Sequence, residues 1–170
     1  MKNVLFCILA FAIIPSLQSC SGPSVKEELT ISEVLITAEG PLFEGANTLQ
    51  GEVPSALTTW LSSKGKTLDD VEQALVKKVT VFPLPDSLHT VVKSLVIQLA
   101  ADNGNMVKAA VLNPLQEGAT SYSLQVAEGA DVLSLLKQNT FFVVGDAELA
   151  SDREQALSMK AELVFEITLK

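Results

Sequence analysis

The most constraining feature of this chain is an alternating pattern over residues 158–169. Polar and apolar side chains take turns along this stretch, and the apolar set is Met159, Ala161, Leu163, Phe165, Ile167 and Leu169. Successive side chains of a β-strand point to opposite faces of its sheet, so the alternation predicts a strand with one face in the core and one in water. Half-buried strands are typical of antiparallel sheets, and we therefore expect a mainly β protein.

Further strand-like stretches occupy residues 27–39, 79–83, 91–101, 106–113, 120–127 and 140–149. The pair 91–101 and 106–113 flanks Asp102-Asn103-Gly104-Asn105, and apolar runs around Asn-Gly are a strong hairpin signal. We expect residues 140–149 and 158–169 to form a last pair. Residues 40–54 contain three glycines and two prolines, which favour a loop or a sheet edge.

Two short helices are expected between the strands, over residues 55–64 and 130–139. Ser55 can cap the first of them, and Gly65 ends it. Thr67 and Asp70 have the spacing of a capping box, which predicts a short helical turn through Leu75. The apolar faces at helical spacing are Leu57, Trp60 and Leu61 in the first helix, and Val132, Leu135 and Leu136 in the second.

These elements favour one architecture. Six or seven strands with short turns and two short crossover helices predict an antiparallel two-sheet sandwich of Ig-like architecture. A β-barrel is the alternative. Residues 29–170 are expected to form this single β-rich globular domain.

The N-terminus has the composition of a secretory signal peptide. Lys2 precedes an apolar run over residues 4–14, and small and polar residues follow. This order predicts a signal peptide over residues 1–19. The run is too short for a transmembrane helix, which needs roughly 20 residues.

Leu17-Gln18-Ser19-Cys20 resembles the lipobox of bacterial lipoproteins. The resemblance implies that the Cys20 thiol receives a diacylglyceryl group and that the signal is cleaved before Cys20. It also implies a protein of the bacterial cell envelope, and Ser21 after the cysteine favours the outer membrane. The other cysteine, Cys7, lies in the segment to be removed and offers no disulfide partner. Residues 20–28 are then the lipidated cysteine and a tether.

The charged residues narrow the range of partners. The formal net charge is −8, from 12 basic and 20 acidic residues, and the acids are scattered. Nucleic acids require clustered Lys and Arg, so no nucleic-acid partner is expected. The expected partners are the membrane, through acyl chains on Cys20, and an envelope protein or ligand that the sequence does not identify.

The sequence contains no recognisable catalytic motif. His89 is the only histidine, and the neighbouring Asp86 and Ser87 follow a proline, which is ordinary turn chemistry. The acids at 69, 70 and 72 suit the first turn of a helix, where they interact favourably with its dipole. Residues 102–105 resemble the start of a calcium loop, but the twelfth position is Asn113 rather than an acid. We expect no catalytic residue, metal or cofactor.

The sequence therefore predicts a lipid-anchored envelope protein that acts as a non-enzymatic binding or assembly module. Two alternatives stay open. One is a carrier of a small apolar ligand or lipid, whose aliphatic interior would leave a cavity. The other is an envelope hydrolase without a recognisable motif, whose acids would meet only in the folded chain.

Overall fold

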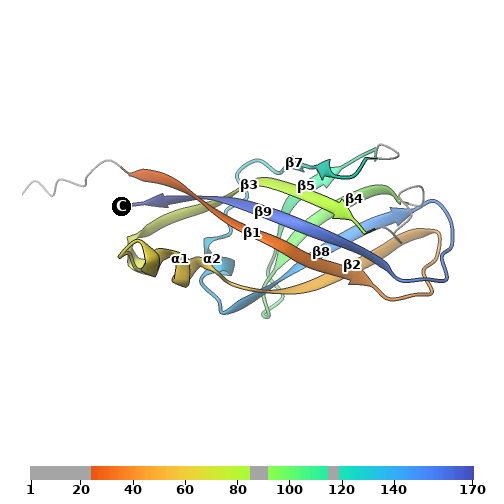
Figure 1. Cartoon of the computed structure of the whole chain (residues 1–170), viewed down its shortest axis with the longest axis horizontal. Coiled ribbons are helices and arrows are strands. Elements are labelled where there is room, and N and C mark those ends of the chain that lie inside the picture. The colour runs from red at the N-terminus through yellow and green to blue at the C-terminus, as the bar shows by residue number, and fades with distance from the viewer. Residues whose placement is uncertain (1–23, 85–91, 115–118) are drawn as a thin grey trace, which may run out of the picture.

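The computed structural model describes residues 24–84, 92–114 and 119–170. Its strands form one nine-stranded sheet in the order β6-β3-β9-β1-β2-β8-β4-β5-β7, and every neighbouring pair is antiparallel. In Figure 1, β1, β3 and β9 lie in front of β4, β5 and β8, so the sheet curls round on itself. The strands are β1 (Val25–Ala38), β2 (Gly45–Pro54), β3 (Val71–Pro83), β4 (Val92–Ala100), β5 (Met106–Leu112), β6 (Tyr122–Ser123), β7 (Gln125–Val126), β8 (Thr140–Leu149) and β9 (Leu157–Leu169).

The sheet is nearly closed into a barrel-like shape. β6 pairs with β3, and β7, which follows after a single residue, pairs with β5. The residue between them, Leu124, donates its backbone N–H to the Val79 carbonyl oxygen at 2.9 Å. One short segment thus joins the two ends of the strand order. The mainly β, antiparallel prediction is confirmed, whereas the two-sheet sandwich is not confirmed and the barrel alternative fits.

The alternating stretch at the end of the chain forms β9, as predicted, and lies between β1 and β3 along its whole length. All of its predicted apolar face is buried. Burial of a large aliphatic or aromatic side chain stabilises a fold by about 1.5–3 kcal/mol. The interior is filled by side chains that are less than 2 % exposed, among them Phe141, Phe165, Ile36, Leu49, Leu95, Ile97 and Leu99.

Two sequence-based expectations about the strands are wrong. β8 and β9 do not pair with each other, because β8 lies between β2 and β4 while β9 lies between β1 and β3. Residues 45–54, expected in a loop or edge, form β2 inside the sheet. Leu49 and Val53 of β2 point into the core, and Gly51 lies where the β1 backbone passes close by. Gly51 therefore serves close packing, whereas Gly45 has a φ of 100° and no atom within 4 Å of an added Cβ.

The β4–β5 hairpin is confirmed. The two strands pair from Leu95↔Leu112 to Ala100↔Met106. Gly104 has a φ of 84°, a conformation that glycine adopts without steric cost. Ala101 donates its backbone N–H to the Asn105 carbonyl oxygen at 2.9 Å, which closes the turn.

Both predicted helices are present in shortened form, as α1 (Leu57–Ser63) and α2 (Leu133–Leu136). Leu57 and Leu61 of α1 are buried, and Trp60 is partly buried against the core. The turn at Thr67 is a single 3-10 turn, η1 (Leu68–Asp70). It does not continue to Leu75 as expected, because β3 begins at Val71 and pairs with β9.

The long strands are bent by β-bulges. The β1–β9 register shifts between Ile31 and Val34, and Glu33 in this bulge has a φ of 61°. The β3–β9 register shifts twice, beside Glu72 and Lys77. Bulges increase local twist and bend a strand, which allows a single sheet to coil and approach closure.

The barrel-like body has two ends. We call residues 25–27, 57–72 and 168–170 the leader end, because β1 begins there with Val25 and β9 ends beside it. Figure 1 shows α1 and the last residues of the chain at this end of the long axis. The far end carries the β1–β2 connection, where Phe43 is 66 % exposed, and the β8–β9 connection. Residues 25–28, expected in the tether, belong to β1, so the ordered domain begins before residue 29.

Candidate functional site

A surface groove of about 640 Å³ lies between β3 and β5. We call it the seam groove, because it follows the line along which the sheet closes. Val76 and Ala130 are buried lining residues and supply apolar surface. The exposed Lys108, Gln125 and Glu128 add a cation, an amide and a carboxylate. The groove thus has a mixed lining, about as polar as it is apolar, with charged groups of both signs.

The seam groove arises because the closing segment changes partner. Ala127 donates its backbone N–H to the Ala109 oxygen of β5 at 2.9 Å. Three residues later the segment has joined β3, where Val76 donates to the Ala130 oxygen at 3.1 Å. Gly129, with a φ of 69°, makes the turn between these contacts. β3 and β5 are not neighbours in the sheet, and the space left between them is the groove.

The chemistry of this groove suits binding. Small-molecule and cofactor sites are typically concave and mostly apolar, with a few polar groups that orient the ligand, and they measure about 300–1,000 Å³. The ammonium group of Lys108 can donate to an anionic or carbonyl group, and the Glu128 carboxylate can accept from a donor. An amphipathic ligand or a segment of another protein fits this combination.

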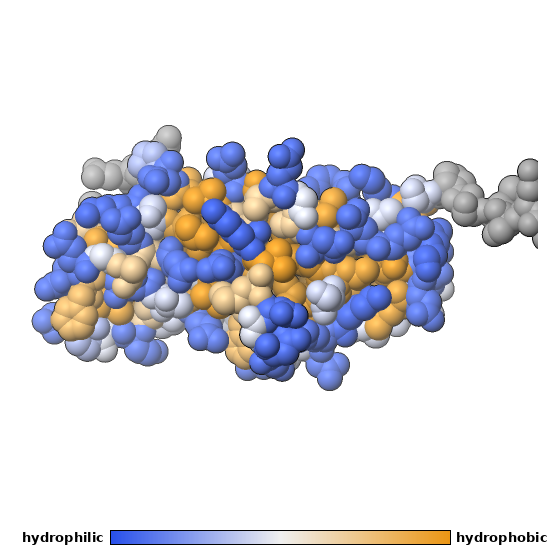
Figure 2. Space-filling model, turned by 180° about the vertical axis from the view of Figure 1, so that it is seen from behind, coloured by the Kyte–Doolittle hydropathy of each residue, from blue (hydrophilic) through white to orange (hydrophobic). Residues whose placement is uncertain are grey.

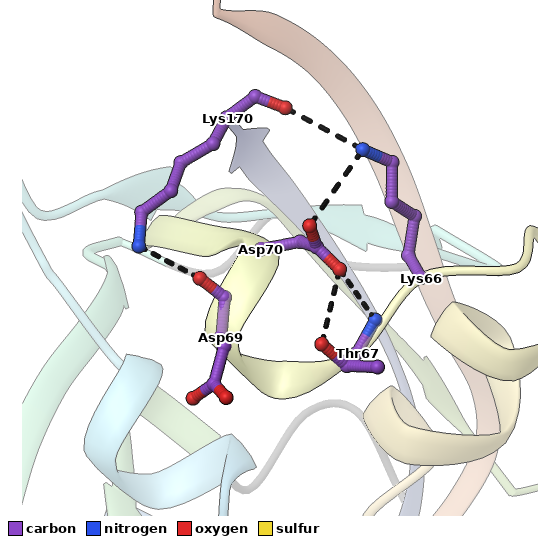
Figure 3. A network of polar contacts seen from close by, with 5 residues as sticks. All are labelled: Lys66, Thr67, Asp69, Asp70 and Lys170. Atoms are coloured by element: carbon purple, nitrogen blue, oxygen red, sulfur yellow. Dashed lines mark hydrogen bonds and ion pairs between the residues drawn. The ribbon is translucent and has the colours of Figure 1, made fainter. Parts of the chain in front are cut away.

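A second groove, of about 440 Å³, lies at the leader end and is lined by residues of α1 and η1. Figure 3 shows the polar network beside it. The Asp70 carboxylate accepts hydrogen bonds from the Thr67 backbone N–H at 2.8 Å and from the Thr67 hydroxyl at 3.0 Å. Lys170 donates its ammonium to the Asp69 carbonyl oxygen at 2.7 Å and its backbone N–H to the Asp70 carbonyl oxygen at 2.8 Å. The network joins η1 to the end of β9.

The hydrogen bonds from Thr67 lower the pKa of Asp70, and the positive charges of Lys66 and Lys170 lower it further. Its ordinary value is 3.8. A folded-state pKa below the unfolded one means that the carboxylate stabilises the fold above the ordinary pKa and loses this effect as the pH falls through the folded pKa.

Asp70→Ala is therefore expected to lower the urea midpoint of unfolding at neutral pH. The difference from wild type should shrink as the pH falls below 3.8 and through the lower pKa of the folded state, where the wild-type carboxylate becomes protonated. Asp69→Ala is the matched control, because only the backbone oxygen of Asp69 accepts from Lys170. A difference between Asp70→Ala and wild type that does not change with pH would contradict the electrostatic account of this cap.

The structure places the sequence-predicted residues as follows. Cys20 and the group Asp86, Ser87 and His89 lie outside the described residues. Asp69 and Asp70 lie in the 3-10 turn rather than in a helix, and Asp70 caps it. Residues 102–105 form the β4–β5 hairpin turn.

Many described carboxylates form ion pairs with lysines around the barrel. Glu28 pairs with Lys77 at 2.7 Å, Glu166 pairs with Lys26 at 2.7 Å, and Glu27 and Glu33 pair with Lys64 and Lys160. In residues 24–84, 92–114 and 119–170, no three His, Cys, Asp or Glu side chains gather as a metal site would require. Within the same ranges, no helix is both long and apolar enough to cross a bilayer.

Sequence reasoning missed the seam groove. Residues 120–127 alternate like one continuous strand, and alternation does not reveal that its two halves pair with different strands. The one local signal is Glu128-Gly129, a turn sequence directly after the strand.

The outer surface of the barrel is also less polar than alternation alone implies. Figure 2 views the molecule from the side of β4, β5 and β8 and shows hydrophobic residues at the surface between hydrophilic ones. Val96 and Phe142, on the outward face of β4 and β8, are partly buried, and Val144 is 9 % exposed.

No family model and no curated protein matches this chain. Among solved structures it is similar to the acid-stable capsid of Helicobacter pylori bacteriophage KHP30, with 14 % identity, a TM-score of 0.33, and coverage of 86 % of this chain and 99 % of that one. Tobacco necrosis virus shows 10 % identity, a TM-score of 0.35 and coverage of 84 % and 95 %. Mud crab tombus-like virus shows 10 % identity, a TM-score of 0.37 and coverage of 86 % and 90 %. Likeness at these TM-scores says nothing about what this chain does.

Proposed function

We propose that this chain is a lipid-anchored protein of the bacterial cell envelope, held at the outer membrane by acyl chains on Cys20, and that its domain binds a partner without catalysing a reaction. The observation that carries the anchor is the lipobox-like Leu17-Gln18-Ser19-Cys20 directly after an apolar run of signal-peptide length. Several acyl chains hold a protein stably on a bilayer, because each buried methylene contributes about 0.8 kcal/mol.

The seam groove supports a binding role. It is a concave surface with a mixed apolar and polar lining, and it carries Lys108 and Glu128 as groups of opposite charge. The described carboxylates that form ion pairs do so with lysines on several strands, and Asp70 caps a turn. Carboxylates held in an ion pair or a cap are less available as catalytic acids, which favours a binding module over a hydrolase.

A photo-reactive amino acid placed at Gln125 tests this function, because Gln125 is exposed and lines the groove. Irradiation of intact cells is expected to yield one discrete adduct of the anchored protein. The matched control is the same substitution at Gln50, an exposed glutamine of β2 outside the groove, which should yield no such adduct. Equal adducts from both positions, or none from position 125, would contradict the groove as the binding site.

The volume of the seam groove also favours a second candidate, a carrier of a small apolar ligand, since about 640 Å³ lies within the usual range for small-molecule sites. Native mass spectrometry of the purified domain separates the two. A bound small molecule that is lost on denaturation would favour the carrier, and a bare polypeptide mass would favour the partner-binding module.

A further inference from the structure

We propose that the leader end of the domain lies against the lipid headgroup layer, so that the far end points away from the membrane. This inference rests on the proposed anchor at Cys20. It adds which surface of the domain meets the lipid.

The first argument is reach. Four residues separate Cys20 from Val25, where β1 begins. Five Cα–Cα steps span at most about 18 Å when fully extended. β9, with 13 residues, runs along the long axis of the body, and a strand of that length extends about 43 Å. The leader end therefore stays near the acylated residue. When the long axis of the domain is perpendicular to the membrane, which we call the upright orientation, the far end lies farther from the membrane than the tether can reach.

The second argument is charge, which favours the upright orientation over a side-on one. The leader end is formally neutral, because it contains four lysines and four acids. These residues are Lys26, Lys64, Lys66, Lys170, Glu27, Asp69, Asp70 and Glu72. The chain has 12 basic and 20 acidic residues in total, and Lys2 belongs to the predicted signal peptide, so seven basic and 16 acidic residues lie in the rest of the mature chain. An anionic leaflet repels the acidic remainder of the domain and does not repel the neutral end.

The third argument is the type of side chain at the leader end. Trp60 is partly exposed there, and the ammonium of Lys64 lies 4.9 Å from its ring centroid. Val25, the first residue of β1 at the same end, is 51 % exposed. Tryptophan and lysine both combine an apolar body with a polar tip, which suits the boundary between headgroups and acyl chains. Because Lys26 pairs with Glu166 at 2.7 Å and Lys66 lies 3.8 Å from Asp70, this surface does not present unbalanced cations.

Trp60 is the only tryptophan of the chain and is therefore an intrinsic probe of this contact. The acylated protein is reconstituted into vesicles of phosphatidylcholine and phosphatidylglycerol, and the neutral aqueous quencher acrylamide is used to quench its fluorescence. Quenching of Trp60 should fall severalfold relative to the unacylated domain in solution, prepared as residues 20–170 with Cys20→Ala. In the double variant Trp60→Phe with Phe43→Trp, the probe at the far end should be quenched equally in both forms.

Charge variants test the orientation without touching Trp60 or Lys64. Lys26→Glu combined with Lys66→Glu makes the neutral leader end strongly negative, and the protection of Trp60 should be lost while the acyl chains keep the protein on the vesicles. Lys93→Glu combined with Lys160→Glu is the matched control, because both lysines are exposed and lie outside the leader end. Circular dichroism verifies that each variant keeps its β structure.

The outcomes separate the two proposals. Failure of the wild-type protein to acquire acyl groups would overturn the anchor and the orientation together. Acylated protein whose Trp60 is quenched as in solution would overturn the orientation alone, as would equal protection of the probes at positions 60 and 43. Protection that survives the Lys26 and Lys66 double variant would refute the charge argument.

Discussion

Gly51→Ala is expected to lower the free energy of unfolding by more than about 3 kcal/mol, enough to prevent stable folding of a marginal domain. A Cβ atom at this position would lie 2.1 Å from the Leu35 carbonyl oxygen of β1. That atom belongs to the backbone of a strand held along its length by β9, so it cannot move aside without breaking the sheet. The measurement is the urea midpoint of unfolding of the domain, monitored by circular dichroism.

Gly145→Ala is the matched control for this prediction. Gly145 lies in β8, opposite Leu49 of β2, and is also surrounded by packed atoms. Its added Cβ would meet the side-chain ends of Ile36, Ile97 and Leu95 at 3.2–3.4 Å, and such ends can shift by a few tenths of an ångström. A much smaller loss of stability is expected, and an equal loss in the two variants would show that the β1 backbone is not the cause of the Gly51 effect.

Cys20→Ala is expected to abolish acylation and to leave either uncut precursor, which keeps its apolar signal peptide, or released domain. The sulfur atom is the attachment point in the lipobox class, and alanine offers no nucleophile in its place. The intact mass of the native protein should exceed that of residues 20–170 by the mass of the acyl groups. This excess should be absent in the variant.

Cys7→Ala provides the control within the same chain, because Cys7 lies in the predicted signal peptide. The processed protein from this variant should have the same mass and the same membrane association as wild type. Acyl labelling that persists in Cys20→Ala, or an unmodified thiol at Cys20 in the native protein, would overturn the proposed anchor.

Local features of the fold could be predicted because they depend on neighbours in the chain. The alternation over residues 158–169 predicts β9, and Gly104 predicts the turn between β4 and β5. The sequence did not predict β2, because glycine has a low local propensity for strands and favours a loop. In the folded chain, Gly51 leaves space for the β1 backbone. The structural role of Gly51 therefore depends on a strand that lies elsewhere in the sequence.

The seam groove could not be predicted for a related reason. Its lining comes from β3, from β5 and from residues 125–130, which are brought together only when the sheet closes. Lys108 and Glu128 belong to no recognisable sequence motif. The residues around them in the sequence do not indicate that the two side chains line the same groove. The candidate anchor, by contrast, is a continuous stretch of residues and is visible without a structure.

The sequence by itself determined the β character of the chain, most of its strands, one hairpin and the prediction of a lipidated N-terminus, since each depends on periodicity or on a short contiguous motif. Only the tertiary structure decided that β9 pairs with β1 and β3 rather than with β8, and that residues 122–127 divide between two strands and bring the sheet close to a barrel. Alternation determines which face of a strand is buried, but the choice of partner depends on packing between residues far apart in the chain.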